Sequence, residues 1–306
     1  MGSELELIER IRRRAFLPPA GGLVMGIGDD CAIFRPRGAA EDLLFTTDLL
    51  VEGTHYLRGT HTAEDVGWKT LARGLSDIAA MGGEPRFCLL SLALGPWQTD
   101  KWVDGFYRGL LRLSRREKTP LAGGDLGHGE RSVCDIVVCG AAPRGKALLR
   151  GGARAGDAIY VSGALGGSAL GLARGNRRGG AAWKKHTRPE PRLALGRFLR
   201  ETVRATAAMD LSDGLSIDLR RLALASRVKA EIEAPPRYPG ASLEQSLHGG
   251  EDYELLFTAP ERTHVPAEFA GVALTRIGML RKGRPGAVTL DGRPLPPLGY
   301  DHLRNS

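Results

Sequence analysis

The chain has 306 residues, of which 42% are hydrophobic and 25% charged, and it carries a formal net charge of +8 with a pI near 9.6. This length suffices for two domains, and the composition excludes disordered and fibrous proteins. No apolar run approaches the ~18 residues that a membrane helix needs, and the opening residues lack the basic-then-apolar order of a signal peptide, so we expect a cytoplasmic protein with no membrane partner.

The cysteines and basic residues narrow the function classes. Four cysteines, Cys31, Cys88, Cys134 and Cys139, form no C-x-x-C pair, which favours buried reduced thiols over a disulfide framework or a zinc site. The basic residues occur as scattered pairs and as one triplet, at 12–14, in a predicted opening helix. They are not interleaved with aromatic residues, which favours solvated helix faces over a nucleic-acid groove.

The first half of the sequence predicts an α/β unit. Strands are expected near 31–35 and 43–47, followed by a helix from about 62 to 82, where Thr62 and Asp65 have capping-box spacing. The pattern then predicts a strand at 86–94, a helix near 99–116, a short strand into "LAGGD", and a strand at 132–142.

The segment 143–157 is rich in glycine and arginine and is predicted to be a linker, which gives domains 1–143 and 144–306. After it, "AIYVSGALGGSALGLA" predicts a strand, a glycine turn and a helix. Helices are expected near 190–204 and 214–226, followed by the strands "YELLFTA" and "GVALTRIGML" and a proline-rich tail.

Acidic residues recur in glycine-rich or apolar surroundings. Asp29 and Asp30 are adjacent like charges that follow glycines in "MGIGDDCAIF". Asp77 lies among apolar residues near the end of a predicted helix, where burial and the helix dipole both disfavour a carboxylate. A nearby cation would resolve both problems.

The same pattern recurs along the chain. It includes Asp48 after the strand "LLFTT", Asp125 in "LAGGD", Asp210 and Asp213 in "AAMDLSDG", and Glu251 and Asp252 in "GGEDYELLF". Each acid alone is explained as a turn or helix cap. Together, without a His–Cys pattern, they favour a shared oxygen-ligand site of the kind that Mg²⁺ or Ca²⁺ prefers.

We therefore expect Asp29 and Asp30 to face Mg²⁺ that carries a nucleotide. The glycines of "GALGGSALG" and "AGGD" could bring backbone N–H groups to its phosphates. The string "GAAPRGKA" at 140–147 is rejected as a P-loop, because Ala147 stands where Ser or Thr must reach Mg²⁺ and Pro143 interrupts the loop.

Seven motifs then match one family in order and spacing. They are "GIGDDCA", "TTDLLVEGTHY", "LSDIAAMGGEP", "AGGD", "HTRPEPR", "MDLSDG" and "GGEDYELLFT". The chain thus resembles the thiamine-monophosphate kinases from about residue 24 to the "GYDH" near its end. The resemblance implies a two-domain α/β (PurM-like) fold with a C-terminal mixed-sheet domain, and an N-terminal sheet that forms a barrel-like core across a homodimer. It also implies ATP-dependent phosphorylation of thiamine monophosphate to thiamine diphosphate.

Motif positions imply roles for individual residues. Several Mg²⁺ ions would be held by Asp30, Thr46, Thr47, Asp48, Asp77, Asp125 and Asp210, with Asp213 as a further ligand. ATP would be contacted by Gly124, Asp125, Arg150 and Ser212, and thiamine monophosphate by His55, Glu251 and Tyr300.

The chemistry of this reaction implies no general base. Its acceptor is a phosphate oxygen that is already anionic, so we expect direct in-line transfer with aspartates as metal ligands and no catalytic proton acceptor. Two segments depart from the family pattern. "SRREKTP" replaces the aromatic residues usual before "GGD", so Arg116 or Glu117 would have to substitute for them, and "GGDLGHGE" lacks the usual threonine.

Two alternative functions remain at this stage. The chain could be another ATP-dependent enzyme of the superfamily that contains aminoimidazole-ribotide synthetase, selenophosphate synthetase and a hydrogenase-maturation ATPase. From a different class, it could be a non-catalytic basic nucleic-acid-binding protein, which would tolerate Asp48→Asn and Asp77→Asn.

Overall fold

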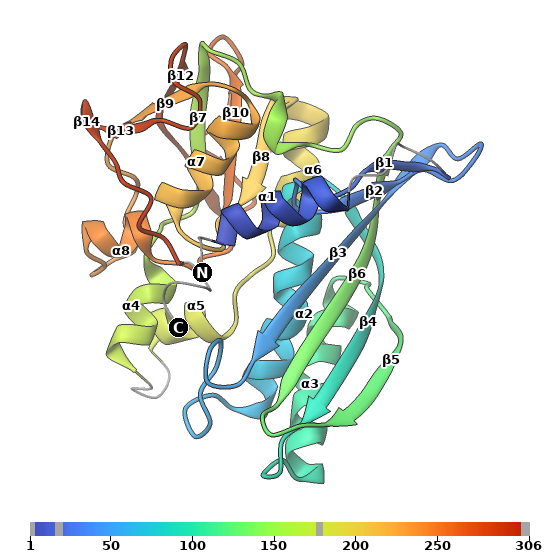
Figure 1. The fold of residues 1–306 in the computed structure, drawn as a ribbon. Helices are drawn as coiled ribbons and strands as arrows, with labels where there is room; N and C mark the ends of the chain where they lie inside the picture. Colours follow the sequence, from blue (N-terminus) through green and yellow to red (C-terminus); the bar gives the residue numbers. More distant parts are fainter. Residues whose placement is uncertain (1–3, 16–20, 176–179, 301–306) are drawn as a thin grey trace.

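The computed structural model describes residues 4–15, 21–175 and 180–300, and it contains two β-sheets with helix α2 (Ala63–Ala80) between the first sheet and the second half of the chain (Figure 1). Helix α1 (Glu4–Arg14) crosses the front of the molecule. No helix in the described part of the chain is both long and apolar enough to cross a membrane.

The first sheet has six strands. In spatial order they are β1 (Leu23–Met25), β2 (Ala32–Phe34), β3 (Glu41–Val51), β6 (Val133–Pro143), β4 (Glu84–Leu94) and β5 (Leu121–His128). Only β4 and β5 pair in parallel, and α3 (Asp100–Arg116) connects them. Two parallel neighbouring strands need a crossover connection of this kind, because a tight hairpin turn joins only antiparallel strands.

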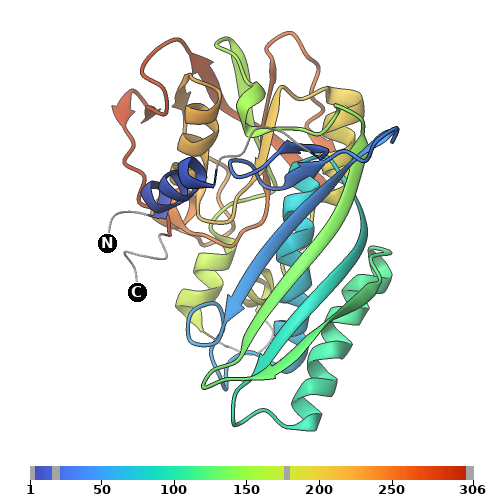
Figure 2. The same cartoon turned by 45° about the vertical axis from the view of Figure 1, so that its right-hand side comes forward.

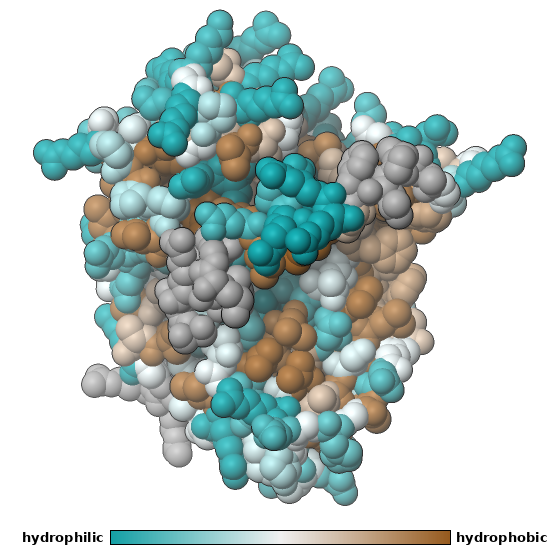
Figure 3. All heavy atoms as spheres, in the orientation of Figure 1, coloured by the Kyte–Doolittle hydropathy of each residue, from teal (hydrophilic) through white to brown (hydrophobic). Residues whose placement is uncertain are grey.

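One face of this sheet is covered and the other is not. Leu44 and Leu50 of β3 point inward and are fully buried in the core that α2 and α3 close, while Leu49 between them is 50% exposed. Figure 2 shows no helix over the outer face of β3, β6 and β4. In Figure 3, hydrophobic surface gathers over the part of the molecule where Figure 1 places these strands.

The second sheet has eight strands. They are β14 (Arg293–Pro294), β13 (Val288–Leu290), β9 (Lys229–Ile232), β12 (Val272–Arg281), β7 (Asp157–Ser162), β10 (Leu255–Pro260) and β8 (Ala207–Asp210), with β11 (Glu268–Phe269) beside β12. The accompanying helices are α4 (Gly167–Arg174), α5 (Ala181–Thr187), α6 (Leu193–Phe198), α7 (Leu215–Ala225) and α8 (Leu243–His248). Helix α6 continues into a π-helical turn, η2 (Leu199–Val203).

These elements confirm the predicted mixed α/β class. The longer predicted strands and helices all occur within a few residues of their expected bounds. Several short elements escaped sequence reasoning, among them β8, β9 and α5, because four to seven residues carry too little periodicity. The "AGGD" segment is also different from expected, since it lies inside β5 and not on a turn.

The predicted linker is packed between the two halves. Leu148 is buried, and the backbone N–H of Leu148 donates to Met81 O at 2.9 Å. Residues Arg150–Gly152 form a 3-10 turn, η1, and the carbonyl of Arg150 accepts a hydrogen bond from Ser226 Oγ at 2.7 Å. The segment therefore places Arg150 firmly, although the domain boundary itself stays a prediction.

Helix α2 begins at the expected cap and is almost wholly buried. Thr62 and Asp65 form the predicted capping box. The helix crosses α3 closely because glycines stand at the contact: a Cβ on Gly67 would meet Phe106 O at 1.9 Å, and one on Gly109 would meet Glu64 O at 1.9 Å.

Replacing Gly109 by alanine should destabilise the fold, because the two helices must move apart to admit one methyl group. We expect a loss of about 2 kcal/mol in the free energy of unfolding, measured by urea denaturation. The control is Asp104→Ala on the exposed side of the same helix, which should change stability by less than about 0.5 kcal/mol. Equal stability of the two variants would show that the helix contact is not tight.

Candidate active site

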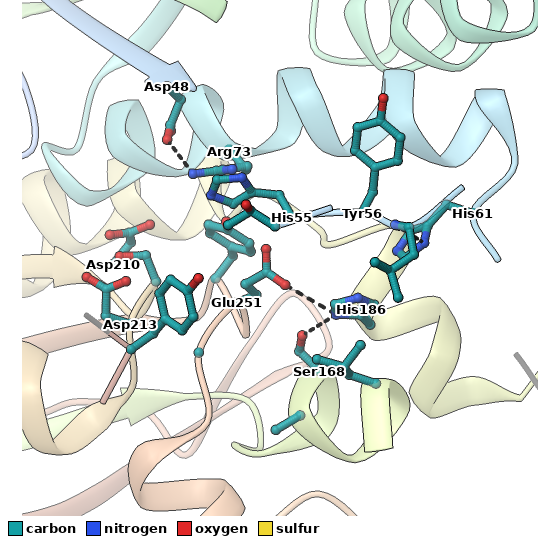
Figure 4. A pocket seen from close by; sticks show the side chains of 18 of the residues that line it. Asp48, His55, Tyr56, His61, Arg73, Ser168, His186, Asp210, Asp213 and Glu251 are labelled. Atoms are coloured by element: carbon teal, nitrogen blue, oxygen red, sulfur yellow. Dashed lines mark hydrogen bonds and ion pairs between the residues drawn. The ribbon is translucent and has the colours of Figure 1, made fainter. Parts of the chain in front are cut away.

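A cavity of about 490 Å³ opens between the two halves of the molecule, and residues from both halves line it (Figure 4). Its walls include the loop after β3, the buried helix α2, the start of α4, and the loops before α7 and β10. Acidic residues gather at one end, including Asp48, Asp210 and Asp213, and the ring side chains of Tyr56 and His61 lie at the other.

Three aspartates meet at the acidic end. One carboxylate oxygen from each of Asp30, Asp77 and Asp210 lies within 4.8 Å of the others. Asp30 comes from the loop before β2, Asp77 from α2, and Asp210 from the end of β8. Three segments far apart in the sequence are thus brought together, as the pattern of acids predicted.

Neighbouring hydroxyls orient these carboxylates without neutralising them. Thr46 Oγ1 donates to Asp77, and Ser76 Oγ donates to Asp210 at 2.7 Å. Burial, reinforced by the other carboxylates, raises the pKa of Asp77 and the pKa of Asp210 well above their ordinary value. Clustered buried carboxylates of this kind are stable as anions only when a cation joins them.

The cluster fits a hard divalent cation. Asp30 Oδ2 is buried and accepts no hydrogen bond from any group in the described ranges. An orphaned carboxylate oxygen beside two further carboxylates matches the oxygen-only donor set that Mg²⁺ prefers.

Asp29 and Asp30 also contact a cationic side chain of the protein, that of Arg150. Arg150 donates its side chain to Asp30 and its backbone N–H to Asp29 at 3.1 Å. Burial and the adjacent Asp30 nevertheless raise the pKa of Asp29 to about 7. Of the two, Asp30 belongs to the group of three carboxylates, while a metal contact of Asp29 stays a prediction.

Asp48 and Asp213 border the cluster and are paired with arginines. Arg73 Nη2 lies 2.9 Å from Asp48 Oδ1, and Arg221 binds Asp213. Arg221 also binds Asp218, a fully buried acid that sequence reasoning missed. Burial raises the pKa of Asp48 above its ordinary value in spite of Arg73.

Thr47, Gly124 and Asp125 lie outside the cavity of this chain. Thr47 Oγ1 donates to Asp135 at 2.6 Å on the uncovered face of the sheet. Asp125 of β5 lies in register with Leu49 across β4 and β6, so three strand spacings, about 14 Å, separate it from β3. The chain by itself does not bring these predicted ligands to the cluster.

The residues predicted to contact thiamine monophosphate all line the cavity. His55 Nδ1 accepts a hydrogen bond from Val51 N at 3.0 Å, which fixes its ring. Tyr300 N donates to Asp213 O at 3.0 Å, and Glu251 N donates to Ser212 O at 2.7 Å. Backbone pairing thus brings Glu251 and Tyr300 to the same loop, 212–213, which also contains the predicted ATP contact Ser212.

Ring side chains at the far end of the cavity escaped sequence reasoning. The ring centroid of His61 lies 5.3 Å from that of His186 and 5.0 Å from that of Trp183. Burial lowers the pKa of His61 to about 4 and that of His186 to about 3, so both rings are neutral near pH 7. These rings form an uncharged wall at the end of the cavity opposite the acidic residues.

Two backbone N–H groups of the glycine segment "GALGGSALG", which was expected to face a phosphate, are taken by a carboxylate of the protein. The carboxylate of Asp252 accepts from the N–H groups of Gly166 and Ser168 at the start of α4. Asp252 is thus the helix cap, and Glu254, two residues on, pairs with Arg192 and Lys185. Part of the "GGEDYEL" and "HTRPEPR" motifs is therefore structural.

Arg116 has protein partners of its own. Its guanidinium lies 4.7 Å from the centroid of the Trp68 ring and 2.7 Å from a carboxylate oxygen of Glu190. It also pairs with Glu117 at 2.7 Å. The "SRREKTP" segment thus contributes an arginine stacked on a tryptophan from α2, and its part in adenine binding stays a prediction.

Helix α2 contributes a charged row that sequence reasoning recognised only at its end. Lys69, Arg73 and Asp77 stand four residues apart on one side of the helix. Lys69 reaches Glu251 of the second half of the chain, and Arg73 reaches Asp48 of β3. Asp77 was predicted from its apolar surroundings, and the same argument applied at i−4 and i−8 would have found both cations.

Comparisons with known proteins agree with this geometry. Residues 28–143 match the model of the AIR synthase related protein N-terminal domain, and residues 154–282 match its C-terminal domain. The chain is 39% identical over 305 residues to a thiamine-monophosphate kinase of Escherichia coli K12, covering 91% of this chain and 92% of that one.

Two solved structures have the same fold. AaThiL complexed with AMPPCP and TMP superposes with a TM-score of 0.86 at 33% identity, covering 98% of this chain and 97% of that one. A thiamine-monophosphate kinase from Stenotrophomonas maltophilia K279a gives a TM-score of 0.76 at 36% identity, covering 95% of this chain and 98% of that one.

Proposed function

The chain belongs to the thiamine-monophosphate kinase family, and from this premise we propose how its cavity binds the two substrates and transfers phosphate between them. The chain uses ATP to phosphorylate thiamine monophosphate. The observation that carries the proposal is the group of three carboxylates at one end of a cavity that both halves of the molecule line.

We assign the acidic end to metal and phosphate. Asp30, Asp77 and Asp210 would hold Mg²⁺. Thr46, Asp48 and Asp213, which border the cluster, would serve as further ligands if several ions bind. When bound, Mg²⁺ would neutralise the phosphate oxygens of ATP and lower the barrier for transfer. Arg150 and Ser212 would hold ATP beside this cluster, and the planar fork of Arg150 suits a phosphate group.

The opposite side of the cavity receives thiamine monophosphate. Glu251 lies between the acidic end and the neutral rings of His61 and His186, which suit an aromatic substrate (Figure 4). His55 and Tyr300 line the same cavity, and Tyr300 adjoins Asp213 through its backbone. Tyr300 beside a cationic thiazolium ring provides a cation–π contact. With its ring at this end, the substrate points its phosphate toward the acidic end.

This arrangement supports direct in-line transfer without a general base. The attacking atom is an oxygen of a phosphate that is already anionic near neutral pH, so no side chain has to remove a proton. The task of the chain is to hold two polyanions in line and to exclude water. Accordingly, we assign no catalytic proton acceptor to the aspartates.

A second copy of the chain would complete the site. Asp125, Asp135 and Thr47 share the uncovered face of the first sheet with the exposed side chains of Leu49 and Leu89. An apolar, uncovered sheet face with an unpaired edge strand is suited to pairing with another sheet. A homodimer formed through this face would bring Gly124 and Asp125 of one copy to the strand of the other that carries Thr47 and Asp48.

The cellular compartment of the protein is a proposal that rests on the sequence. The cytoplasm is the compartment expected from the sequence, and it suits a kinase that draws on ATP. It stays a prediction, as do the number of Mg²⁺ ions and the domain boundary.

Replacing Asp77 by asparagine tests the metal assignment. We expect kcat/KM to fall by about 100-fold or more, because one carboxylate of the cluster is lost. Without Mg²⁺, the melting temperature should stay equal or rise, since the change removes one of three mutually repelling anions. The rise in melting temperature on adding Mg²⁺ should shrink. Activity and thermal unfolding with EDTA and with Mg²⁺ give both readouts.

Asp104→Asn is the matched control, because Asp104 is an exposed carboxylate on α3. It should leave kcat/KM and the Mg²⁺-dependent stabilisation unchanged. An Asp77→Asn protein that kept full activity and the full stabilisation by Mg²⁺ would contradict the metal assignment.

Mixing two inactive variants tests the contribution of the second copy. Asp125→Asn and Asp77→Asn should each be inactive alone. In a mixed dimer, one site carries both changes and the other carries none, so random exchange of subunits should restore about a quarter of the wild-type activity. The measurement is product formation after the two purified variants have been allowed to exchange subunits.

The control mixture combines Asp77→Asn with Asp210→Asn, whose carboxylates meet within one chain. Every site of that mixed dimer carries one change, so activity should not return. No recovery in the Asp125 mixture, despite proven subunit exchange, would place Asp125 outside the partner's site.

A further inference from the structure

We propose that Lys69 is a positioning residue that keeps Glu251 ionised and oriented toward the cationic ring system of the thiamine substrate. The inference rests on the proposed function and deepens it. It gives Lys69, which is not among the predicted ligands, a role in selecting a cationic substrate. Lys69 touches no substrate itself and acts through Glu251.

The environment of Lys69 is unusual for a lysine. Its side chain is completely buried in α2, and its Nζ lies 2.8 Å from the Glu251 carboxylate and 3.1 Å from His55 O. A lysine is almost never fully buried unless it is paired. Its two partners are two predicted thiamine contacts from opposite halves of the chain, so Lys69 joins the two walls of the substrate end.

Glu251 is held in a fixed, strained conformation. Its backbone has φ of +64°, in the left-handed region that side chains other than glycine seldom adopt. Lys69 Nζ lies 2.8 Å from each carboxylate oxygen of Glu251 and donates a hydrogen bond to Oε2. Because Glu251 lines the cavity, this fixed carboxylate stands beside the place proposed for the cationic ring of the substrate.

Several other groups face Glu251. They are Arg73 on α2, His186 on α5, His61 before α2, and the phenols of Tyr253 and Tyr300. His186 Nδ1 lies 3.3 Å from the carboxylate and also contacts Ser168 Oγ at 3.0 Å. Burial lowers the pKa of both histidines, so they are neutral at working pH, and Arg73 is already paired with Asp48. Lys69 is therefore the cation that Glu251 contacts directly.

This charge balance sets the state of Glu251. Burial alone would raise the pKa of its carboxyl, but the charges of Lys69 first, then of His186, which is protonated only at such low pH, and of Arg73 outweigh burial and hold the pKa at about 2. Without Lys69, a buried carboxyl is expected to titrate several units higher, toward neutral pH. The carboxyl would then be protonated at the acidic end of the working range and would no longer attract a cation.

The test compares wild type, Lys69→Met and Lys101→Met, the last being an exposed lysine on α3. Calorimetry gives Kd for thiamine monophosphate, and steady-state assays give KM for each substrate and kcat between pH 6.5 and 8.5. We expect Lys69→Met to weaken binding of thiamine monophosphate about tenfold or more, while KM for ATP changes less than about twofold.

The pH dependence separates positioning from structural damage. The ratio of Kd between Lys69→Met and wild type should grow as pH falls, and taking the ratio removes the substrate's own titration. A Lys69→Met protein with a pH-independent ratio, or with KM raised equally for both substrates, would overturn the inference. Lys101→Met should match wild type throughout.

Glu251→Gln gives a second route if Lys69→Met does not fold. It mimics the protonated carboxyl, so it should bind thiamine monophosphate as weakly as Lys69→Met does at low pH, with no added pH dependence. Wild-type affinity in Glu251→Gln would also overturn the inference. Failure of the wild-type protein to use thiamine monophosphate at all would instead contradict the proposed function.

Discussion

The structure depends on the burial of a charged row along one helix. Lys69, Arg73 and Asp77 lie on α2, an otherwise apolar helix packed between the two halves of the chain. Charges in such a place are unfavourable unless each finds a partner. Lys69 pairs with Glu251 and Arg73 with Asp48, while Asp77 faces two further acids. The first two charges are balanced by the protein and the third requires a cation from outside.

This balance explains why the site lies where it does. The partners of α2 come from β3 on one side and from the loops before α7 and β10 on the other, so the two sheets are tied together across the cavity. Under the proposed metal assignment, the unfavourable group of carboxylates at Asp30, Asp77 and Asp210 would be retained because its instability in the metal-free state becomes affinity for Mg²⁺ and ATP.

The sequence predicted the types of residue that form the site better than it predicted which residues contact one another. Aspartates in apolar or glycine-rich surroundings marked Asp30, Asp77 and Asp210, which the structure brings together, because a buried carboxylate is costly wherever it stands. Their role as metal ligands stays a prediction. The partners of Glu251 and Asp252 were not predictable, since ion pairs such as the one with Lys69 join residues 182 positions apart. The partner of the glycine turn was not predictable for the same reason. Two N–H groups at the start of α4 donate to Asp252, which comes from a distant loop, and so do not face a phosphate. Thr47 and Asp125 lie on the uncovered sheet face, away from the carboxylate cluster of the same chain.

The measurement that tests the account most directly is product formation from thiamine monophosphate, ATP and Mg²⁺, with free thiamine as a parallel substrate and EDTA as a control. The account predicts thiamine diphosphate from the monophosphate only, and only with the divalent cation present. Phosphate transfer to free thiamine but not to the monophosphate, or full activity in EDTA, would contradict it, because the acidic end would then have a role other than joining two phosphate groups through metal.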